Sequence, residues 1–264
     1  MSRCELSAHA APAVFFANRS VYISATSHAS PGNLGHANRV CINVYNAEIM
    51  FALFVVIALA GLVITGYAPK DRATWWLEVA PVLVALMLLA WTRRRFPLTP
   101  LAYALIAIHS VILMIGAHYT YAEVPLGFWI EHALNLTRNH YDRIGHFAQG
   151  FVPALITREI LLRCSPLKRG AMLSFVVVCV CLAISAFYEL IEWWTALIAG
   201  SGANAFLGTQ GDAWDTQWDM FLALVGAVTC VVSMSRIHDR ALARLTMAPP
   251  AKSQRQTHMD WRSY

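Results

Sequence analysis

The sequence predicts an all-α, polytopic membrane protein with six transmembrane helices. Of the 264 residues, 58% are hydrophobic and only 13% are charged, whereas an average soluble domain is about 25% charged. The mean hydropathy is +0.50. The apolar residues also gather in runs close to the roughly 20 residues that a helix needs to cross a bilayer. A single soluble core could not bury this much apolar sequence.

The first three spans lie in long apolar runs. Residues 49–69 contain no charged side chain and form the first span. The second, residues 75–91, contains one charge, Glu78, near its start. The third lies within the charge-free run 96–122.

The last three spans carry ionisable residues near one end. The fourth, residues 144–160, is the weakest, because its charge-free part stops at Thr157. The fifth, residues 171–198, carries Glu189 and Glu192 near its end. The sixth, residues 218–235, begins with Asp219. With six spans, both termini lie on the same side of the membrane.

The basic residues predict which side that is. Sixteen of the 20 lysines and arginines fall in the N-terminal segment, the loops after the second and fourth spans, and the C-terminal tail. The opposite side has only Lys70, Arg72, Arg138 and Arg143. By the positive-inside rule both termini are cytoplasmic, and we expect a multi-pass protein of a bacterial inner membrane. Because the positive charge is explained by orientation, we expect the lipid bilayer as partner and no nucleic acid.

The chain divides into three parts. Residues 1–48 lack sustained periodicity and are expected to be a disordered extension, with Met50 as a candidate translation start. Residues 49–236 form the six-helix membrane domain, and residues 237–264 a mobile cytoplasmic tail.

Ionisable residues from distant parts of the sequence converge on the extracytoplasmic side of this topology. They recur at helical spacing, so the members of each set share one helix face. The sets are Asp142, His146 and Gln149; Ser185, Glu189 and Glu192; and Asp212, Asp215 and Asp219. Ionised groups in hydrocarbon cost several kcal/mol unless they are paired or hydrated. We therefore predict that the three stripes face one another across a polar cavity.

Carboxylates with histidine suit a divalent metal or acid–base chemistry. We assign catalytic roles to Asp142, His146, Glu189, Glu192, Asp215 and Asp219, and metal ligation to His146, Glu189 and Asp219. The substrate class would be a lipid, an envelope precursor or another small molecule at the outer leaflet. No H-E-x-x-H motif, nucleophile elbow or P-loop is present, so the reaction stays open.

Other interpretations remain open. Each acid lies near an interface where water is within reach, Arg143 could pair with Asp142 or Glu189, and Glu78 and His118 taken singly favour a structural role. The same residues could form the cation or proton site of an ion-coupled transporter, although no internal repeat is visible. They could also hold the helices of an accessory protein together.

Five segments resemble the YjdF-like proteins of bacterial inner membranes. They are "GYAPKDRATWWLEVAPV", "GAHYTYAEVPLGFW", "RNHYDRIGHFAQGFVPALITREILLR", "SAFYELIEWW" and "GTQGDAWDTQWDMFLALVGA". The resemblance spans residues 50–236 and implies an inner-membrane protein, but it supplies no reaction.

A second likeness is to the VanZ-like membrane proteins. It rests on Asp142 with His146, on Glu189 or Glu192, and on Asp219 followed by Gly226. The asparagine expected between that aspartate and glycine is Ala223 here.

Overall fold

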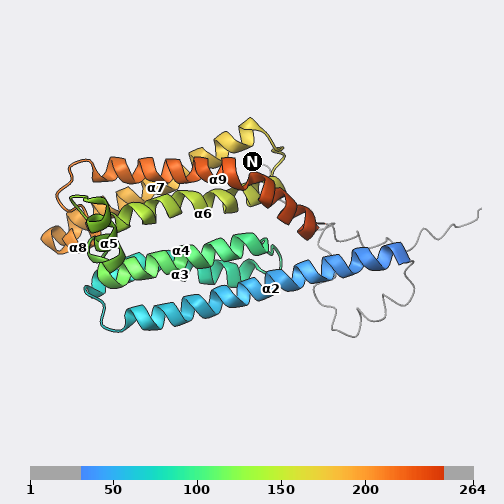
Figure 1. The fold of residues 1–264 in the computed structure, drawn as a ribbon, viewed down its shortest axis with the longest axis horizontal. Helices are drawn as coiled ribbons and strands as arrows, with labels where there is room; N and C mark the ends of the chain where they lie inside the picture. Colours follow the sequence, from blue (N-terminus) through green and yellow to red (C-terminus); the bar gives the residue numbers. More distant parts are fainter. Residues whose placement is uncertain (1–30, 247–264) are drawn as a thin grey trace, which may run out of the picture. The chain divides into compact units, whose positions relative to one another are not determined.

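The computed structural model describes the backbone of residues 31–246 and the side chains of residues 45–245 except 201, 204 and 205. The described chain is entirely helical, which confirms the predicted fold class (Figure 1). Each predicted span falls within one long helix. These helices are α2 (Pro31–Gly66), α3 (Arg72–Thr92), α4 (Pro100–Tyr119), α6 (Tyr141–Cys164), α7 (Ala171–Ala199) and α9 (Asp215–Thr246). Residues 45–242 form one compact unit, and the packing below is that of this unit.

The terminal boundaries differ from those expected. Helix α2 begins at Pro31, so residues 31–48 are helical where disorder was expected. Helix α9 continues to Thr246, so the predicted tail is helical over residues 237–246. Both extensions are polar stretches continuous with apolar spans, and helix propagation is cheap once a helix is nucleated. The expectations for residues 1–30 and 247–264 lie outside the described residues.

Five of the six long helices are long and apolar enough to cross a membrane; the exception is α6. Helix α6 carries Asp142 and Arg143 at its start and three more charges in its second half. It lies between α4 on one side and α7 and α9 on the other (Figure 1). A helix surrounded by protein can keep polar side chains that lipid would exclude. This explains why α6 has the weakest apolar signal, and six membrane crossings stay a prediction.

The two ends of the helix bundle have different connections. Helices α2, α4 and α7 end, and α3, α6 and α9 begin, at what we call the outer end, the predicted extracytoplasmic side (Figure 1). Short elements not predicted from the sequence also lie in its loops. They are η2 (Tyr121–Glu123), α5 (Pro125–Leu134), η3 (Gly200–Ala203) and α8 (Asn204–Leu207). The opposite end is called the inner end.

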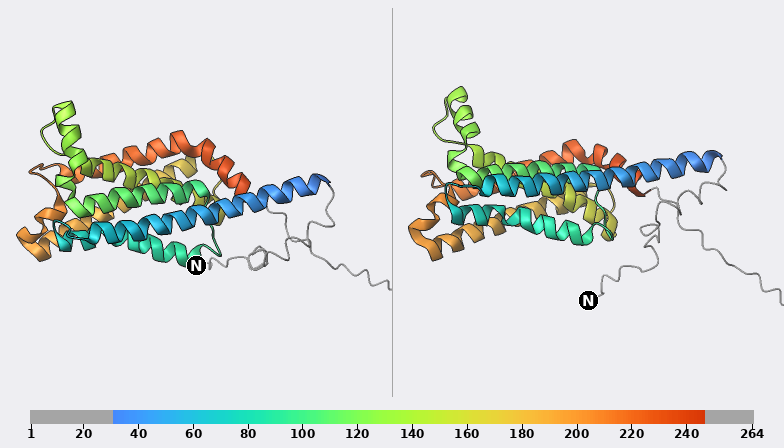
Figure 2. Two further views of the ribbon diagram at one scale, coloured as in Figure 1. Left: turned by 60° about the horizontal axis from the view of Figure 1, so that its bottom comes forward. Right: turned by 90° about the horizontal axis from the view of Figure 1, so that it is seen from below.

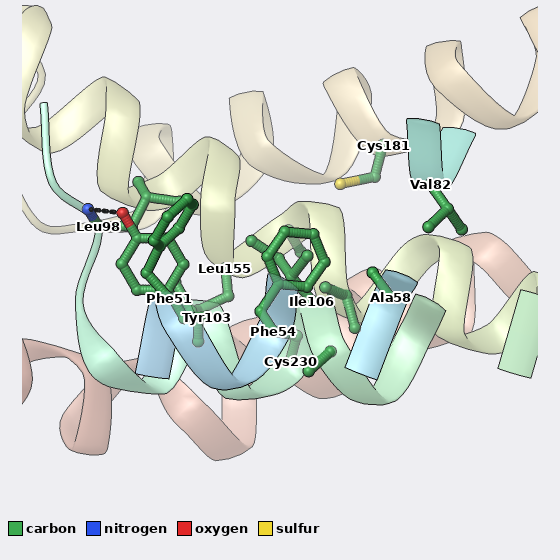
Figure 3. Close-up of a cluster of buried hydrophobic side chains, with 14 of the residues drawn as sticks. Phe51, Phe54, Ala58, Val82, Leu98, Tyr103, Ile106, Leu155, Cys181 and Cys230 are labelled. Atoms are coloured by element: carbon green, nitrogen blue, oxygen red, sulfur yellow. Dashed lines mark hydrogen bonds between the residues drawn. The ribbon is translucent and has the colours of Figure 1, made fainter. Parts of the chain in front are cut away.

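Apolar side chains fill the bundle between the two ends. Phe54 and Tyr103 from α2 and α4 meet Leu155 of α6 in the centre, and each is almost fully buried (Figure 3). The hydroxyl of Tyr103 accepts a hydrogen bond from the backbone N–H of Leu98 at 3.3 Å. The apolar middle therefore separates polar groups at the outer end from those at the inner end.

Two glycines bring α6 and α9 into close contact. A Cβ atom added at Gly150 would lie 1.8 Å from the carbonyl oxygen of Ala223. One added at Gly226 would lie 2.1 Å from the carbonyl oxygen of Phe147. Small residues at such crossings let helix backbones approach closely. This contact fixes how α6 and α9 are rotated against each other, and hence which polar side chains meet at the outer end.

The outward faces of the long helices are apolar. Val63 on α2, Trp91 on α3, Phe175 on α7 and Val232 on α9 are each about two-thirds exposed or more. Soluble monomers rarely expose apolar surface this widely. Apolar helices with such faces are those of a membrane-embedded bundle in contact with lipid.

Candidate functional site

His146 stands at the centre of a polar cluster at the outer end. Its Nε2 atom lies 3.5 Å from Oδ1 of Asp142 and 3.8 Å from Oδ1 of Asp219. Its Nδ1 atom lies 4.0 Å from Oε1 of Glu189 and 2.9 Å from Oε1 of Gln149. Side chains of α6, α7 and α9 thus meet around one imidazole. We call Asp142, His146, Glu189, Glu192 and Asp219 the outer cluster.

The contact with Gln149 selects the histidine tautomer. The amide oxygen of Gln149 can only accept a hydrogen bond, so Nδ1 of His146 carries the proton. Nε2, the other ring nitrogen, faces the carboxylates of Asp142 and Asp219. Metal-binding histidines usually donate their second ring N–H to a neighbouring acceptor in this way. The arrangement therefore leaves Nε2 as the nitrogen able to bind a metal ion.

Two sets of side chains have the spacing for a metal ion. In the first, single ligand atoms of Asp142, His146 and Asp219 all lie within 4.8 Å of one another. In the second the same holds for His146, Glu189 and Glu192. The ligands predicted from the sequence, His146, Glu189 and Asp219, are all in the outer cluster but are divided between these sets. The first set uses the free Nε2, whereas the second would compete with Gln149 for Nδ1.

Several oxygens in and beside the outer cluster are buried without a hydrogen bond. Both oxygens of Glu189, Oδ1 of Asp219 and the hydroxyl of Ser185 have none with normal geometry. Thr216 approaches Glu189 without meeting that geometry. Asp219 is only 2% exposed. A buried polar group without a partner costs roughly 1–3 kcal/mol, and more if charged, and no described residue supplies these oxygens with a hydrogen bond of normal geometry.

Arginines pair with the aspartates at the border of the cluster. Arg138 lies 2.9 Å from Asp215 and 3.1 Å from Asp212. Arg143 lies 3.3 Å from Asp212 and stacks on Trp218 at 5.0 Å from the ring centroid. Arg143 thus pairs with neither partner considered for it from the sequence. Asp215, a predicted catalytic residue, is occupied by an arginine and lies outside both metal-spaced sets.

Glu78 also reaches this region, from α3. The hydroxyl of Tyr188 donates a hydrogen bond to its Oε2 at 3.1 Å. Glu78 interacts electrostatically with Asp142 and His146, so it belongs with the cluster. Tyr121, in the loop after α4, also approaches Glu78, and burial raises the pKa of its phenol well above 10.0. Tyr121 therefore stays protonated and able to donate.

His118 lies apart from the cluster. Its Nδ1 is 2.9 Å from the carbonyl oxygen of Thr65. This contact ties the end of α4 to α2, which is a structural role.

The inner end contains a second buried network, which the sequence reading missed. Glu159, fully buried, accepts hydrogen bonds from Thr99 (backbone N–H 3.0 Å, hydroxyl 2.8 Å), from Arg163 (2.8 Å) and from His238 (3.1 Å). Arg158 pairs with Nδ1 of His238 at 2.9 Å and with Asp239 at 2.7 Å. No atom of this inner network is among the buried polar atoms without a partner. Of these contacts, the sequence contains a local signal only for the ion pair of Glu159 with Arg163, which are four residues apart on one helix.

Comparison with known proteins places the chain among membrane proteins. Residues 50–240 match a family described as "Predicted membrane protein (DUF2238)". The chain is 56% identical over 183 residues to the Inner membrane protein YjdF of Escherichia coli (strain K12), covering 69% of this chain and 88% of that protein. No solved structure matches. The match to YjdF confirms the predicted family resemblance. The likeness to VanZ-like proteins stays a prediction.

Proposed function

The chain belongs to the DUF2238 family of predicted membrane proteins, and on that premise we propose that it binds a divalent metal ion in the outer cluster. Asp142, His146 and Asp219 are the ligands, and Glu189 and Glu192 lie beside them as further ligands or general bases. The protein has several helices able to cross a membrane, and its Escherichia coli relative is named an inner membrane protein, so we place it in the inner membrane as a multi-pass protein. The outer cluster faces the extracytoplasmic side.

The contrast between the two buried clusters carries this proposal. At the inner end, carboxylate and cationic groups satisfy one another through short hydrogen bonds. At the outer end, four acids surround one imidazole, and oxygens of Glu189 and Asp219 lack donors. Buried like charges close together are costly. A divalent cation would supply the missing positive charge and the missing partner at once.

Hard oxygen ligands with one imidazole suit Mg²⁺, Mn²⁺ or Zn²⁺. A bound ion of this kind polarises phosphoryl or carbonyl groups and lowers the pKa of bound water. Glu189 or Glu192 would accept the proton of that water. Because the cluster lies in a lipid-embedded bundle, its substrate would be a lipid or an envelope precursor with a polar group that reaches the outer end.

The proposal is tested by metal binding to purified protein in lipid nanodiscs. Wild-type protein that has been treated with EDTA should bind added Mn²⁺ and so reduce the electron paramagnetic resonance signal of free Mn²⁺. Added Zn²⁺ or Mg²⁺ should compete with Mn²⁺ for the site. His146→Ala and Asp219→Asn should lose this binding. Glu123→Gln, which removes an exposed carboxylate at the same end, is the matched control and should bind like wild type. Equal binding by all four proteins, or by none, would refute the metal site.

An ion-coupled transporter would give a different outcome. Proton or cation flux into proteoliposomes that is lost in Asp219→Asn but does not require a divalent metal would favour transport over a metal-dependent function.

The orientation is tested separately with cysteines introduced one at a time. Ala213→Cys, in the exposed loop before α9, should react with a membrane-impermeant maleimide added to intact spheroplasts. Lys168→Cys, in the exposed loop before α7, should react only after the membrane is permeabilised. The reverse pattern would place the outer cluster on the cytoplasmic side.

A further inference from the structure

The described residues cover little of helix α5, at the outer end. Among its ten residues only Gly127 is buried. Leu126, Phe128, Trp129 and Leu134 are exposed, Trp129 by 79%. In both views of Figure 2, α5 stands away from the long helices. These apolar side chains therefore leave much of their surface uncovered by the described residues.

The protein nevertheless holds the start of α5 firmly. The side-chain amide of Asn139 donates to the carbonyl oxygen of Val124 at 2.9 Å, and its Oδ1 accepts from the backbone N–H of Tyr141. Gly127 packs so closely on Asn139 that an added Cβ would lie 1.6 Å from Oδ1. Gln210 makes two hydrogen bonds with the backbone of Asn139. The exposure of α5 is thus a fixed arrangement built on a buried asparagine.

The residues of α5 are sorted by face. Leu126, Trp129 and Ala133 recur at i, i+3 and i+7 and share one side of the helix. Glu131 lies on the opposite side of the helix. A helix with an apolar face and a polar face is typical of one that lies in the plane of a membrane interface. With ten residues, α5 extends roughly 15 Å, about half the hydrocarbon thickness, so it cannot cross the bilayer.

The position of α5 also identifies what covers it. Trp193 and Trp194 near the end of α7, and Trp214 and Trp218 at the start of α9, are exposed at the same end of the bundle. Tryptophans at helix ends mark the level of the lipid headgroups. The apolar face of α5 thus continues the lipid-facing surface of the bundle at the level where that surface meets water.

We propose that α5 is an interfacial helix that inserts the face containing Leu126 and Trp129 into the bilayer leaflet at the outer end. Its occupant is lipid rather than a protein partner. The helix is joined through Asn139 to the neighbouring Arg138, which pairs with Asp215 at the border of the outer cluster. The helix that contacts lipid and the arginine at the border of the outer cluster, Arg138, therefore belong to the same connection between α4 and α6. The inference stands whether or not the cluster binds a metal.

The test uses a fluorophore on single cysteines in a chain whose native cysteines are replaced. Trp129→Cys places the probe on the apolar face, and Thr137→Cys, in the exposed loop after α5, is the matched control outside that face. The protein is reconstituted in vesicles of phosphatidylethanolamine and phosphatidylglycerol. A probe at position 129 should be quenched by lipids that carry a doxyl group near the headgroup. A probe at position 137 should instead be quenched by aqueous iodide.

A second measurement avoids the cysteine replacements. In vesicles of brominated lipid, wild-type protein should lose more tryptophan emission than Trp129→Phe, because the variant lacks one lipid-exposed indole. Quenching of position 129 by iodide alone would overturn the proposal. So would protection from both quenchers together with a dimer in solution, because α5 would then contact a second copy.

Discussion

Replacing one carboxylate by its amide at each end of the bundle should have opposite consequences. Glu159→Gln and Asp219→Asn are nearly isosteric, so neither leaves a cavity, and the comparison isolates hydrogen bonding and charge. In the inner network, Glu159 accepts from four donors. In the outer cluster, Oδ1 of Asp219 accepts from none, and the nearest imidazole nitrogen is 3.8 Å away.

Glutamine cannot satisfy the surroundings of Glu159. Nδ1 of His238 accepts from Arg158, so Nε2 of His238 must carry the N–H that faces Glu159. An amide NH₂ at either position of the carboxylate would therefore meet a donor, and Arg163 would lose its counter-charge. Removing one partner of a buried ion pair costs about 3–5 kcal/mol. We expect Glu159→Gln to lower the free energy of unfolding by that amount, with or without metal.

Asparagine at position 219 should be tolerated in metal-free protein. Its N–H can donate to Nε2 of His146 or to Asp142, so the free energy of unfolding in EDTA should change by no more than about 1 kcal/mol. The variant should lose the stabilisation that metal gives the wild-type protein. That stabilisation is about 2.7 kcal/mol at a metal concentration 100 times Kd.

Unfolding by sodium dodecyl sulfate in mixed micelles, with EDTA or with Mn²⁺, measures both quantities on the same samples. The reasoning would be refuted by Asp219→Asn costing as much as Glu159→Gln in EDTA, because Asp219 would then be a structural group. Stabilisation of Asp219→Asn by Mn²⁺ to the same extent as wild type would refute the ligand role.

Three further predictions follow from single contacts. Gly150→Ala should force α6 and α9 apart, lower the free energy of unfolding by about 1–3 kcal/mol through overpacking and abolish Mn²⁺ binding. Gly202→Ala, whose Cβ would have no neighbour closer than 3.9 Å, should have none of these effects. Calorimetry and metal titration on both variants test this. Gln149→Leu should weaken Mn²⁺ binding about 10- to 100-fold because Nδ1 of His146 loses its hydrogen-bond acceptor. Gln149→Glu keeps an acceptor and should bind Mn²⁺ normally. Equal affinity in the wild-type protein and both variants would contradict the tautomer assignment. Hydrogen bonds from the first turn of α3 lower the pKa of the Asp71 carboxyl below 3.8. The stabilisation from this helix cap is therefore complete above pH 3.8 and is lost as the pH falls through the lowered pKa. Asp71→Ala should lower the free energy of unfolding by about 1 kcal/mol at neutral pH, and in thermal melts the difference from wild type should persist at pH 6 and vanish in acid.

Much of the candidate site could be predicted because it rests on short-range regularities. The i, i+4 and i+7 spacing placed Asp142, His146 and Gln149 on one face of α6, and the three side chains do meet there. The spacing of Asp212 with Asp219 was misleading, because α9 begins only at Asp215 and Asp212 belongs to the preceding loop.

The inner network shows the limit of such reasoning. Arg158 and Glu159 lie about 80 positions before His238 along the chain, and nothing in the local pattern connects them to it. Positive charges at that end were attributed to membrane orientation, which stays a prediction and says nothing about pairing. Hydrogen bonds between distant segments depend on helix rotation, which local spacing does not encode.

The sequence by itself determined that this chain is a helical membrane protein, roughly where its helices lie, and that its acids and histidine gather towards one end. Those properties follow from how each segment partitions between water and hydrocarbon, which composition and spacing already express. Only the tertiary structure decided that α6 is enclosed by protein, that Gln149 frees Nε2 of His146, and that one buried cluster is paired while the other is not. The close contact at Gly150 and Gly226 sets the rotation of α6 against α9. A rotation of that kind decides which polar atoms face one another, and it is a property of the packed helices together.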